Sequence, residues 1–471
     1  MRHYVLYFIC EKREKRRKNR IKTQNRTHVG EEANMRRKIT ALFFVTLALM
    51  FTFSCGTDVF TDNSGNASFN GKDGKISFSW WGGDSRHKAT LKAVDEFMAA
   101  NGDVSVSCSY AAWTNWEESF AAQLYAGNAP DLCQININWL NEFGGESCKN
   151  FTNLDLYSNY IDLTQYDNAV LSRCMVGSMT KAVPISVTGR IFFWNETTFS
   201  NAGLGVPQTL EELYAYAEVL RTKLGDDYYP LALGEYDRFL LMVTYLECRY
   251  GKAWTQGVNL GYTEDEIAEG MRFIQGLEER HVIPTLKELH GSGADSIDKD
   301  LRWTDGRFAG IFEWDSSVEK YRSALAEGQQ LAVGNYFTDM GTSKGGFTKI
   351  ALAYAIPADS RHPVEAARLL QFLVSNEKAV KAVGTERGIP VNKKAKQVCS
   401  DNNLLTSLTA LANARVMAWC SFSMDNSFEA PSLKNTDGVY ADVMSGLSYG
   451  DYSAEEAAKV LASGVRNVLN S

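Results

Sequence analysis

The stretch from Ile76 to Lys88, ISFSWWGGDSRHK, brings flat aromatic rings, glycines and ionisable groups together within a few residues. An apolar run that ends in a glycine-rich turn before a helix is typical of the carboxyl edge of a sheet, where open α/β folds bind ligands. Strand alternation predicts that Trp80 points into the core. We expect Trp81, Asp84 and Arg86 to form the first wall of a binding cleft, with a purely structural turn capped by Asp84 as the alternative.

Aromatic side chains also neighbour amides, carboxylates or guanidinium groups further along the chain. A sugar presents CH patches that stack on rings and hydroxyls that donate and accept hydrogen bonds, so its site needs both kinds of group. For Arg190 a structural ion pair is the alternative, and for Trp314 a place in the core. The further candidate contacts are Asn136, Asn138, Trp139, Arg190, Tyr236, Asp237, Trp314 and Asp315.

The HExxH, P-loop and GxGxxG motifs of common catalytic and cofactor sites are absent from the sequence. The cysteines form no CxxC and the histidines are scattered, so we expect neither a metal nor a cofactor. A glycoside hydrolase would need two carboxylates about 5 to 10 Å apart. Several acidic residues could supply that pair by chance: Asp84, Glu235, Asp237, Glu313 and Asp315.

The N-terminal part of the chain has the composition of an export signal. Residues Glu11 to Arg26 form a basic run with almost no apolar residues, and we interpret residues 1–34 as a non-native upstream extension before a start at Met35. Residues 35–54 contain a basic start, an apolar run and a small residue, as signal peptides do. Cys55 resembles the lipidated cysteine of a bacterial lipobox, although Thr52 departs from that pattern, and residues 55–73 read as a flexible tether.

The charge of the remaining chain argues against nucleic acid as a partner. Residues 1–54 hold 13 of the 49 Lys and Arg and 4 of the 56 Asp and Glu, which leaves 36 against 52 and a net charge of about −16. Neutralising phosphates requires a basic surface. A membrane partner is therefore expected only through a lipid on Cys55, in an extracytoplasmic location at the cell surface or in the periplasm.

Strand and helix patterns alternate from Ile76 onward, which predicts βαβ units and a parallel sheet. Helix starts are indicated where Thr209 precedes Glu212 and where Ser453 precedes Glu456, because that spacing suits a capping box.

Several segments together carry a family resemblance: WWGGDSRHKATL, AGNAPDL before ININWL, PISVTGRIFFWNETTF, DGRFAGIFEW, RGIPV and SYGDYSAEEAAKVL. With the export signal, their order resembles the extracellular solute-binding proteins of bacterial ABC sugar importers, from about Gly74 to the end of the chain. The resemblance implies an α/β, two-lobed periplasmic-binding-protein-like fold of type II with a central ligand cleft. By location, Trp419 resembles the family's stacking residue in the second lobe.

On this resemblance, residues 74–186 and 343–389 form the first lobe, and residues 187–342 and 390–471 form the second. Glycines and prolines near residues 184–190, 341–346 and 388–390 suit hinges between them. The expected function is capture of a carbohydrate, most consistent with an oligosaccharide, and its delivery to the transmembrane subunits of an importer. A lipid-anchored glycoside hydrolase and a non-catalytic surface adhesin stay as alternatives.

Overall fold

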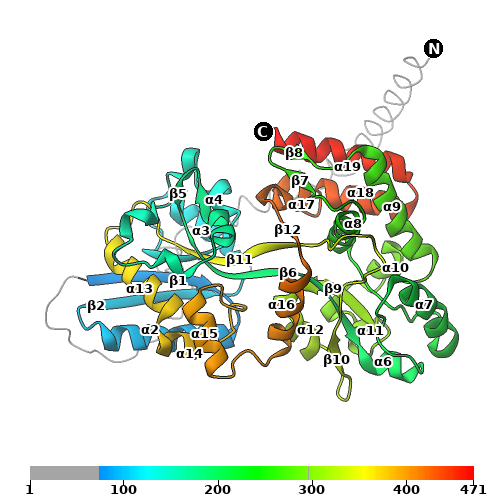
Figure 1. Cartoon of the computed structure of the whole chain (residues 1–471), viewed down its shortest axis with the longest axis horizontal. Coiled ribbons are helices and arrows are strands. Elements are labelled where there is room, and N and C mark those ends of the chain that lie inside the picture. The colour runs from blue at the N-terminus through cyan, green and yellow to red at the C-terminus, as the bar shows by residue number, and fades with distance from the viewer. Residues whose placement is uncertain (1–73, 114, 295, 471) are drawn as a thin grey trace, which may run out of the picture. The chain divides into compact units, whose positions relative to one another are not determined.

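The computed structural model describes residues 74–113, 115–294 and 296–470. In the first lobe β1 lies between β2 and β3 and runs parallel to both, which confirms the predicted α/β fold with parallel strands. Figure 1 shows β1 beside β2. Trp80 is fully buried on one face of β1, whereas Trp81 packs on the other. The elements that open this lobe are β1 (Gly74–Trp81), α2 (Asp84–Ala100), β2 (Val104–Ala111), α3 (Trp116–Tyr125) and β3 (Leu132–Ile135).

Two long strands, β6 (Val183–Asn195) and β11 (Phe347–Ala355), link the lobes (Figure 1). β11 pairs antiparallel with β3 and with the first half of β6. The second half of β6 pairs antiparallel with β9 (Gly310–Trp314) and β10 (Leu331–Val333) of the second lobe. β12 (Phe422–Ser423) runs parallel to the start of β11. One 13-residue strand therefore belongs to the sheets of both lobes.

Glycine has a specific role at two of the predicted crossings. Gly346, directly before β11, has φ +83°, and Gly388 has φ +85°. A side chain is disfavoured in this left-handed region, so glycine lets the chain turn there at little cost. Both positions fall where the sequence predicts hinges.

The remaining helices of the first lobe pack mainly around its sheet. α15 contacts α14 and α13, and Val380 of α14 buries Ala395 and Cys399 of α15. α15 thus packs with the first lobe, although residues 390–471 were assigned to the second. The elements involved are α4 (Trp139–Glu142), β4 (Met175–Val176), β5 (Met179–Thr180), α5 (Asn168–Leu171), α13 (Pro363–Ser375), α14 (Glu377–Val383) and α15 (Lys393–Asp401).

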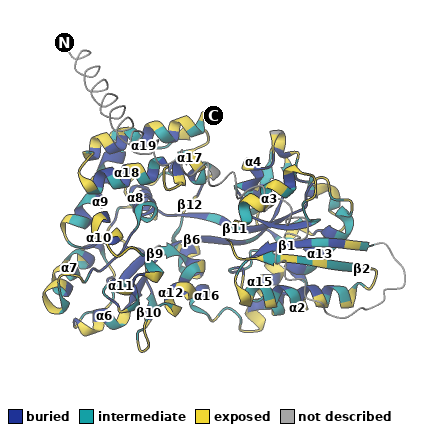
Figure 2. Ribbon diagram, turned by 180° about the vertical axis from the view of Figure 1, so that it is seen from behind, coloured by how far each residue is buried: buried dark blue, intermediate teal, exposed yellow. Residues whose placement is uncertain are grey.

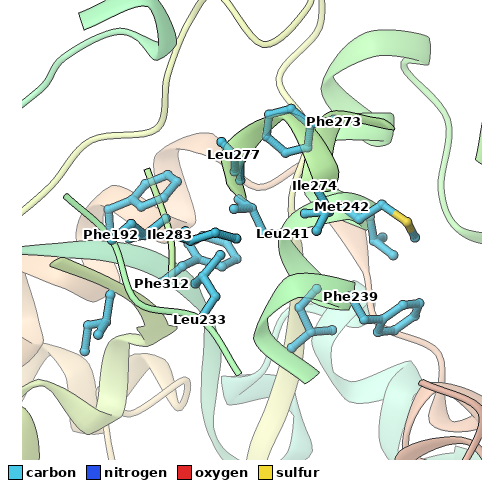
Figure 3. Packing of buried hydrophobic residues seen from close by; sticks show 14 of the residues in the cluster. Phe192, Leu233, Phe239, Leu241, Met242, Phe273, Ile274, Leu277, Ile283 and Phe312 are labelled. Atoms are coloured by element: carbon cyan, nitrogen blue, oxygen red, sulfur yellow. The ribbon is translucent and has the colours of Figure 1, made fainter. Parts of the chain in front are cut away.

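The second lobe is built on a large apolar cluster in which α8 packs against α9 (Figure 3). Figure 2 shows buried residues on the inner faces of these helices and exposed residues on their outer faces. Trp254 and Trp303 are buried in this cluster. The helices and short strands are α6 (Glu196–Asn201), α7 (Leu210–Leu224), α8 (Glu235–Tyr250), β7 (Thr255–Gln256), β8 (Asn259–Leu260), α9 (Glu264–Glu279), α10 (Leu286–His290), α11 (Leu301–Thr304), α12 (Val318–Ser323), α16 (Leu408–Trp419), α17 (Pro431–Lys434), α18 (Val439–Tyr449) and α19 (Ala454–Leu469).

The predicted helix starts are largely confirmed. Ser453 and Glu456 form a reciprocal capping box at the start of α19. At α7, the Thr209 hydroxyl accepts a hydrogen bond from the Glu212 amide, but the Glu212 carboxylate accepts from the amide of Gln208 instead of closing the box. The local sequence thus places these helix starts by satisfying their free N–H groups.

The expectations for residues 1–34, 35–54 and 55–73, including Cys55, lie outside the described residues. The seven cysteines that the structure describes are all unpaired. No helix within residues 74–113, 115–294 and 296–470 is long and apolar enough to cross a membrane.

Candidate ligand-binding cleft

The glycine-rich turn after β1 holds the three residues first expected at the cleft. Asp84 is the first residue of α2 and is exposed, and Gly83, not Asp84, occupies the N-cap position. The structural alternative in which Asp84 caps the helix is therefore wrong. Arg86 is tied to the chain instead: its Nε donates to the Glu386 carbonyl at 2.9 Å and its Nη1 to the Trp81 carbonyl at 3.3 Å.

Four tryptophans gather at the carboxyl ends of β1, β2 and β3, and we call them the tryptophan cluster: Trp81, Trp113, Trp116 and Trp139. The ring centroid of Trp81 lies 5.1 Å from that of Trp113 and 5.2 Å from that of Trp139. Trp81 is 7% exposed and Trp139 is 0% exposed, whereas Trp113 is 44% exposed. Trp113 therefore presents the free aromatic surface of this cluster, with the buried rings supporting it.

Trp113 was missed in the sequence, and Trp139 was expected at the ligand but lies in the core. The Trp139 indole N–H donates to Glu117 Oε1 at 2.7 Å, so both its ring and its polar group are used within the lobe. The overlooked signal was the same one that marked Trp81, because Trp113 also follows the end of a parallel strand.

Asn136 and Asn138 lie between β3 and α4 and are half-buried. The Asn136 carbonyl accepts the Trp139 amide at 3.2 Å, which begins α4. The Asn138 side chain donates to Glu142 Oε2 at 3.2 Å. Burial raises the pKa of Glu142, as does the nearby charge of Glu117. The amide and carboxylate groups of α4 are thus placed at the edge of the tryptophan cluster.

Arg190, on β6, sits at the centre of a buried ion-pair group in the second lobe. Its Nη1 lies 2.8 Å from Asp237 Oδ1 and 3.1 Å from Glu313 Oε1, and it also donates to the Phe312 carbonyl at 2.6 Å. Burial alone would lower the pKa of Arg190, but Glu313 and Asp237 outweigh it and raise that pKa. The structural ion pair that was the alternative for Arg190 is what the structure contains.

Burial raises the pKa of Asp237 even though Arg190 opposes that shift. The second oxygen of Asp237 accepts the Gly234 amide at 3.2 Å, which holds the start of α8. Both partners of Arg190 are therefore engaged inside the protein, and Asp237 is not a free group for a ligand in this conformation.

Tyr236 and Trp314 lie close to Arg190, and their rings are half-buried. The Arg190 guanidinium carbon lies 4.8 Å from the Trp314 ring centroid and 5.8 Å from that of Tyr236. Each ring also faces a lysine: Lys349 Nζ is 4.4 Å from Trp314, and Lys434 Nζ is 5.3 Å from Tyr236. Such cation–π contacts fix the rings beside positive charge.

The two lysines share one carboxylate, and we call this set the lysine pair: Lys349 on β11 and Lys434 on α17, with Glu429 between them. Lys349 Nζ contacts both oxygens of Glu429 at 2.8 Å, and Lys434 Nζ contacts Oε1 at 2.5 Å. Burial would raise the pKa of Glu429, but the lysines lower it to about 2. Two positive charges therefore face one negative charge.

A further cation, Arg173, contacts β11 at the residue that precedes Lys349. Arg173 Nη1 donates to the Thr348 hydroxyl at 3.0 Å and to its carbonyl at 3.3 Å, next to Lys349 on β11. No carboxylate forms an ion pair with Arg173 within the described part of the chain. Burial lowers the pKa of Arg173 but leaves a guanidinium charged at neutral pH. None of these cations except Arg190 was identified from the sequence.

Asp315, expected at the ligand, instead lies in the interior of the second lobe. It is 1% exposed, and its carboxylate accepts hydrogen bonds from the Thr188 hydroxyl and, at 2.6 Å, from the Asn413 side chain. Burial raises the pKa of Asp315 to about 6 despite these hydrogen bonds. It ties the end of β9 to β6 and α16, so its role here is structural.

Trp419, at the end of α16, is separated from the other candidates. Its ring stacks on that of Tyr336 with centroids 5.3 Å apart and planes 3° from parallel. It lines a hollow of about 380 Å³ whose other residues include Arg415 and Gln208. None of the tryptophan cluster or of the lysine pair lines that hollow.

A larger cavity lies between α4 of the first lobe and the segment around α17 of the second. Its volume is about 630 Å³, within the range of sites for small molecules. Asn138 lines it from the edge of the tryptophan cluster and Glu429 from the lysine pair. The full lining is Asn138, Asn141, Glu142, Gly257, Val258, Asp425, Ser427, Glu429, Ala430, Pro431, Val468 and Leu469.

Residues 92–412 match the family model of the bacterial extracellular solute-binding proteins. The chain belongs to this family. Members of the family bind solutes rather than convert them, so this solute-binding protein is not an enzyme. Three of the five acidic residues considered for a hydrolase are engaged inside the protein: Asp237 and Glu313 pair with Arg190, and Asp315 is buried in a hydrogen-bond network.

Several solved structures of solute-binding proteins are similar to this solute-binding protein. A periplasmic solute-binding protein of Pectobacterium atrosepticum is 30% identical, with 84% of this chain and 99% of that one covered and a TM-score of 0.78. A periplasmic oligogalacturonide-binding protein of Yersinia enterocolitica, solved with saturated digalacturonic acid, is 28% identical, with 84% and 99% covered and a TM-score of 0.76. The GacH receptor of Streptomyces glaucescens, at 15% identity, 85% and 100% coverage and a TM-score of 0.69, shares the fold. The predicted two-lobed fold and the family resemblance are both confirmed.

Proposed function

We propose that the protein captures an oligosaccharide in the cavity between α4 and α17 and delivers it to an ABC importer. The observation that carries the proposal is that one ligand-sized cavity of about 630 Å³ is lined from both lobes, by Asn138 of the first and Glu429 of the second. Only a closed state lets a ligand contact both sides fully, so binding favours closure. The resemblance in structure to a protein solved with digalacturonic acid supports this ligand class.

Within this proposal, the ligand stacks on the exposed ring of Trp113 and meets polar groups on both sides. Asp84, Asn136 and Asn138 are the proposed contacts of the first lobe, where they are exposed or half-buried. Tyr236 and Trp314 are the proposed contacts of the second lobe. Trp81, Trp139 and Arg190 support these residues from beneath, because they are largely or fully buried.

The charges favour an acidic sugar over a neutral one. Lys349 and Lys434 share the single carboxylate of Glu429. The two ammonium groups match a ligand carboxylate, although Glu142 and Asp425 add negative charge to the cavity wall, and hydrogen bonds between ionised groups are roughly twice as strong as neutral ones. We therefore propose that the oligosaccharide contains at least one uronate unit.

Calorimetric titration of the purified protein with digalacturonic acid and with neutral galactobiose tests two claims: that the ligand is a carbohydrate, and that this carbohydrate is acidic. We expect a dissociation constant in the micromolar range or below for the acid, equivalent to roughly 8 kcal/mol. Galactobiose should bind at least tenfold more weakly. Tighter binding of galactobiose would disprove the acidic class alone, and no binding from a broad sugar panel would disprove the carbohydrate class.

The rival functions make different predictions. A hydrolase would release monosaccharide from digalacturonic acid on prolonged incubation, whereas a binding protein returns it intact. An adhesin would bind without closing, so small-angle X-ray scattering should then show the same radius of gyration with and without the sugar. We expect a smaller radius with ligand, because the lobes close on it.

The lobe boundaries and the membrane anchor belong to the same proposal. We propose that residues 74–186 and 343–389, with α15 added, move against the second lobe about the crossings at β6, β11 and the segment after Gly388. We further propose that residues 35–54 are removed and that Cys55 carries the lipid. Intact mass and fatty-acid labelling of the expressed protein test this, with Cys55→Ser as the variant that should lose the label and release the protein from membranes.

A further inference from the structure

Arg387, outside the proposed sugar cleft, is a buried cation that forms no ion pair with a carboxylate in the described part of the chain. It lies directly before the crossing at Gly388 and is 3% exposed. Its Nε donates to Gln134 Oε1 at 2.9 Å, but Nη1 and Nη2 have no hydrogen-bond partner. No carboxylate pairs with it in residues 74–113, 115–294 or 296–470. The neighbouring Glu386 carboxylate accepts from the Ser85 hydroxyl at 2.7 Å at the exposed surface.

A second guanidinium makes this region more positive still. Burial and then the charge of Arg387 lower the pKa of Arg86 to about 10, so the two groups lie close enough to repel each other. Arg86 donates hydrogen bonds to the backbone carbonyls of Glu386 and Trp81, which carry no net charge. Neither arginine forms an ion pair with a carboxylate among the described residues, and the charge of the exposed Glu386 offsets theirs only in part.

Arg387 lines a small cavity of about 40 Å³. A cavity needs roughly 10 to 15 Å³ to hold one water molecule, so this one has room for a small ion or a few waters but not for a sugar. The remaining walls are mostly apolar, and include Leu373, Val380 and Pro184. The site is thus a small chamber with a cation in its wall.

An unpaired charge inside a protein is strongly unfavourable unless something compensates for it. Water would satisfy the N–H groups of Arg387 but would leave its charge uncompensated. A small anion does both, since a guanidinium presents its N–H groups in a planar fork. We propose that Arg387 binds a monovalent anion of about the size of chloride in this cavity.

The anion would act on the architecture of the first lobe rather than on the sugar. The Gln134 side chain that accepts from Arg387 donates in turn to the Trp81 carbonyl at 3.2 Å. The Arg387 carbonyl accepts the hydroxyl of Ser186 on β6. Occupancy would therefore hold three segments together: the end of β1, strand β6 and the crossing at Gly388.

Bromide provides a direct test in the wild-type protein. Crystals soaked in sodium bromide should show an anomalous peak within about 3.5 Å of Arg387 Nη1 or Nη2, which is the reach of an ion–donor contact. A peak there supports the proposal. Its absence at high bromide concentration, with water density at the same place, would overturn it.

Thermal unfolding supplies an independent readout. At constant ionic strength, replacing sodium gluconate by sodium chloride should raise the melting temperature of the wild type by roughly 1 to 3 °C, in a saturable manner. Arg387→Met should lose this increment, whereas Arg368→Met, which removes a surface guanidinium paired with Asp103, should keep it. Equal increments in all three proteins would mean that chloride acts elsewhere and would refute the site.

Discussion

The ammonium group of Lys349 lies 4.4 Å from the ring centroid of Trp314, while the same group holds both carboxylate oxygens of Glu429 at 2.8 Å. One side chain on a crossing strand therefore fixes an aromatic ring of β9 and an acidic residue before α17. Burial lowers the pKa of Lys349, and Lys434 and Arg190 lower it further, whereas Glu429 opposes the shift. A ligand carboxylate at this point would favour the charged ammonium group in the same way.

Lys349→Met tests whether that charge selects an acidic ligand. The affinity for digalacturonic acid should fall at least tenfold in calorimetry, because a charge-assisted contact is lost. The affinity for galactobiose should change less than threefold. Lys381→Met, which removes a lysine paired with Glu377 on the surface of α14, is the matched control and should leave both affinities unchanged. An equal loss for both sugars would show that Lys349 only supports the shape of the cleft.

Trp113→Ala tests whether the exposed member of the tryptophan cluster contributes to sugar binding, whereas the buried members contribute to stability. Since Trp113 is 44% exposed, its loss should weaken sugar binding about tenfold while the melting temperature changes by less than about 2 °C. Trp139→Ala should instead destabilise the protein by about 3 to 5 kcal/mol in urea unfolding, because a fully buried ring is removed. Normal sugar binding by a folded Trp113→Ala protein would exclude stacking on this ring.

Arg190→Met should be among the most destabilising single substitutions in the second lobe. It leaves Asp237 and Glu313 without their partner in a buried place, which typically costs about 3 to 5 kcal/mol. The triple variant Arg190→Met, Asp237→Asn, Glu313→Gln removes all three charges and should recover most of that loss. Urea unfolding of the three proteins checks this, and a mild effect of Arg190→Met alone would contradict the ion-pair account.

The raised pKa of Asp315 predicts how the free energy of unfolding changes with pH. Its pKa is raised by burial from the model-compound value of 3.8 to about 6, so the folded state holds the proton more tightly than the unfolded state. The contribution of Asp315 to the free energy of unfolding is therefore fully present below about pH 4. About 2 to 3 kcal/mol of this contribution is lost as the pH rises to about 6.

The comparison with Asp315→Asn isolates this contribution. The amide is uncharged and keeps an oxygen for the Asn413 side chain, so the variant should fold. The difference in unfolding free energy between wild type and variant should shift in favour of the variant as the pH rises from 4 to 6. A difference that stays constant over this range would show that Asp315 titrates in the same way in both states.

Local patterns in the sequence were sufficient for the fold class and for part of the first lobe. The alternation along β1 determined that Trp80 is core, because successive side chains of a strand point to opposite faces. The same alternation placed Trp81 on the other face, at the edge where the parallel strands end. Ser453 and Glu456 likewise marked the start of α19, since the capping box is formed within four residues.

Only the tertiary structure decided which polar groups meet. Lys349 and Glu429 are 80 residues apart in the sequence, and no local pattern connects them. Their contact depends on β11 crossing to the second lobe beside α17. The same holds for Asp315, which neighbours Trp314 in the sequence but turns to Thr188 and Asn413 in the interior. The sequence by itself determined the strands, the helix starts and the family. The packing of distant segments decided the site, because long-range contacts depend on how the lobes and crossings fold together.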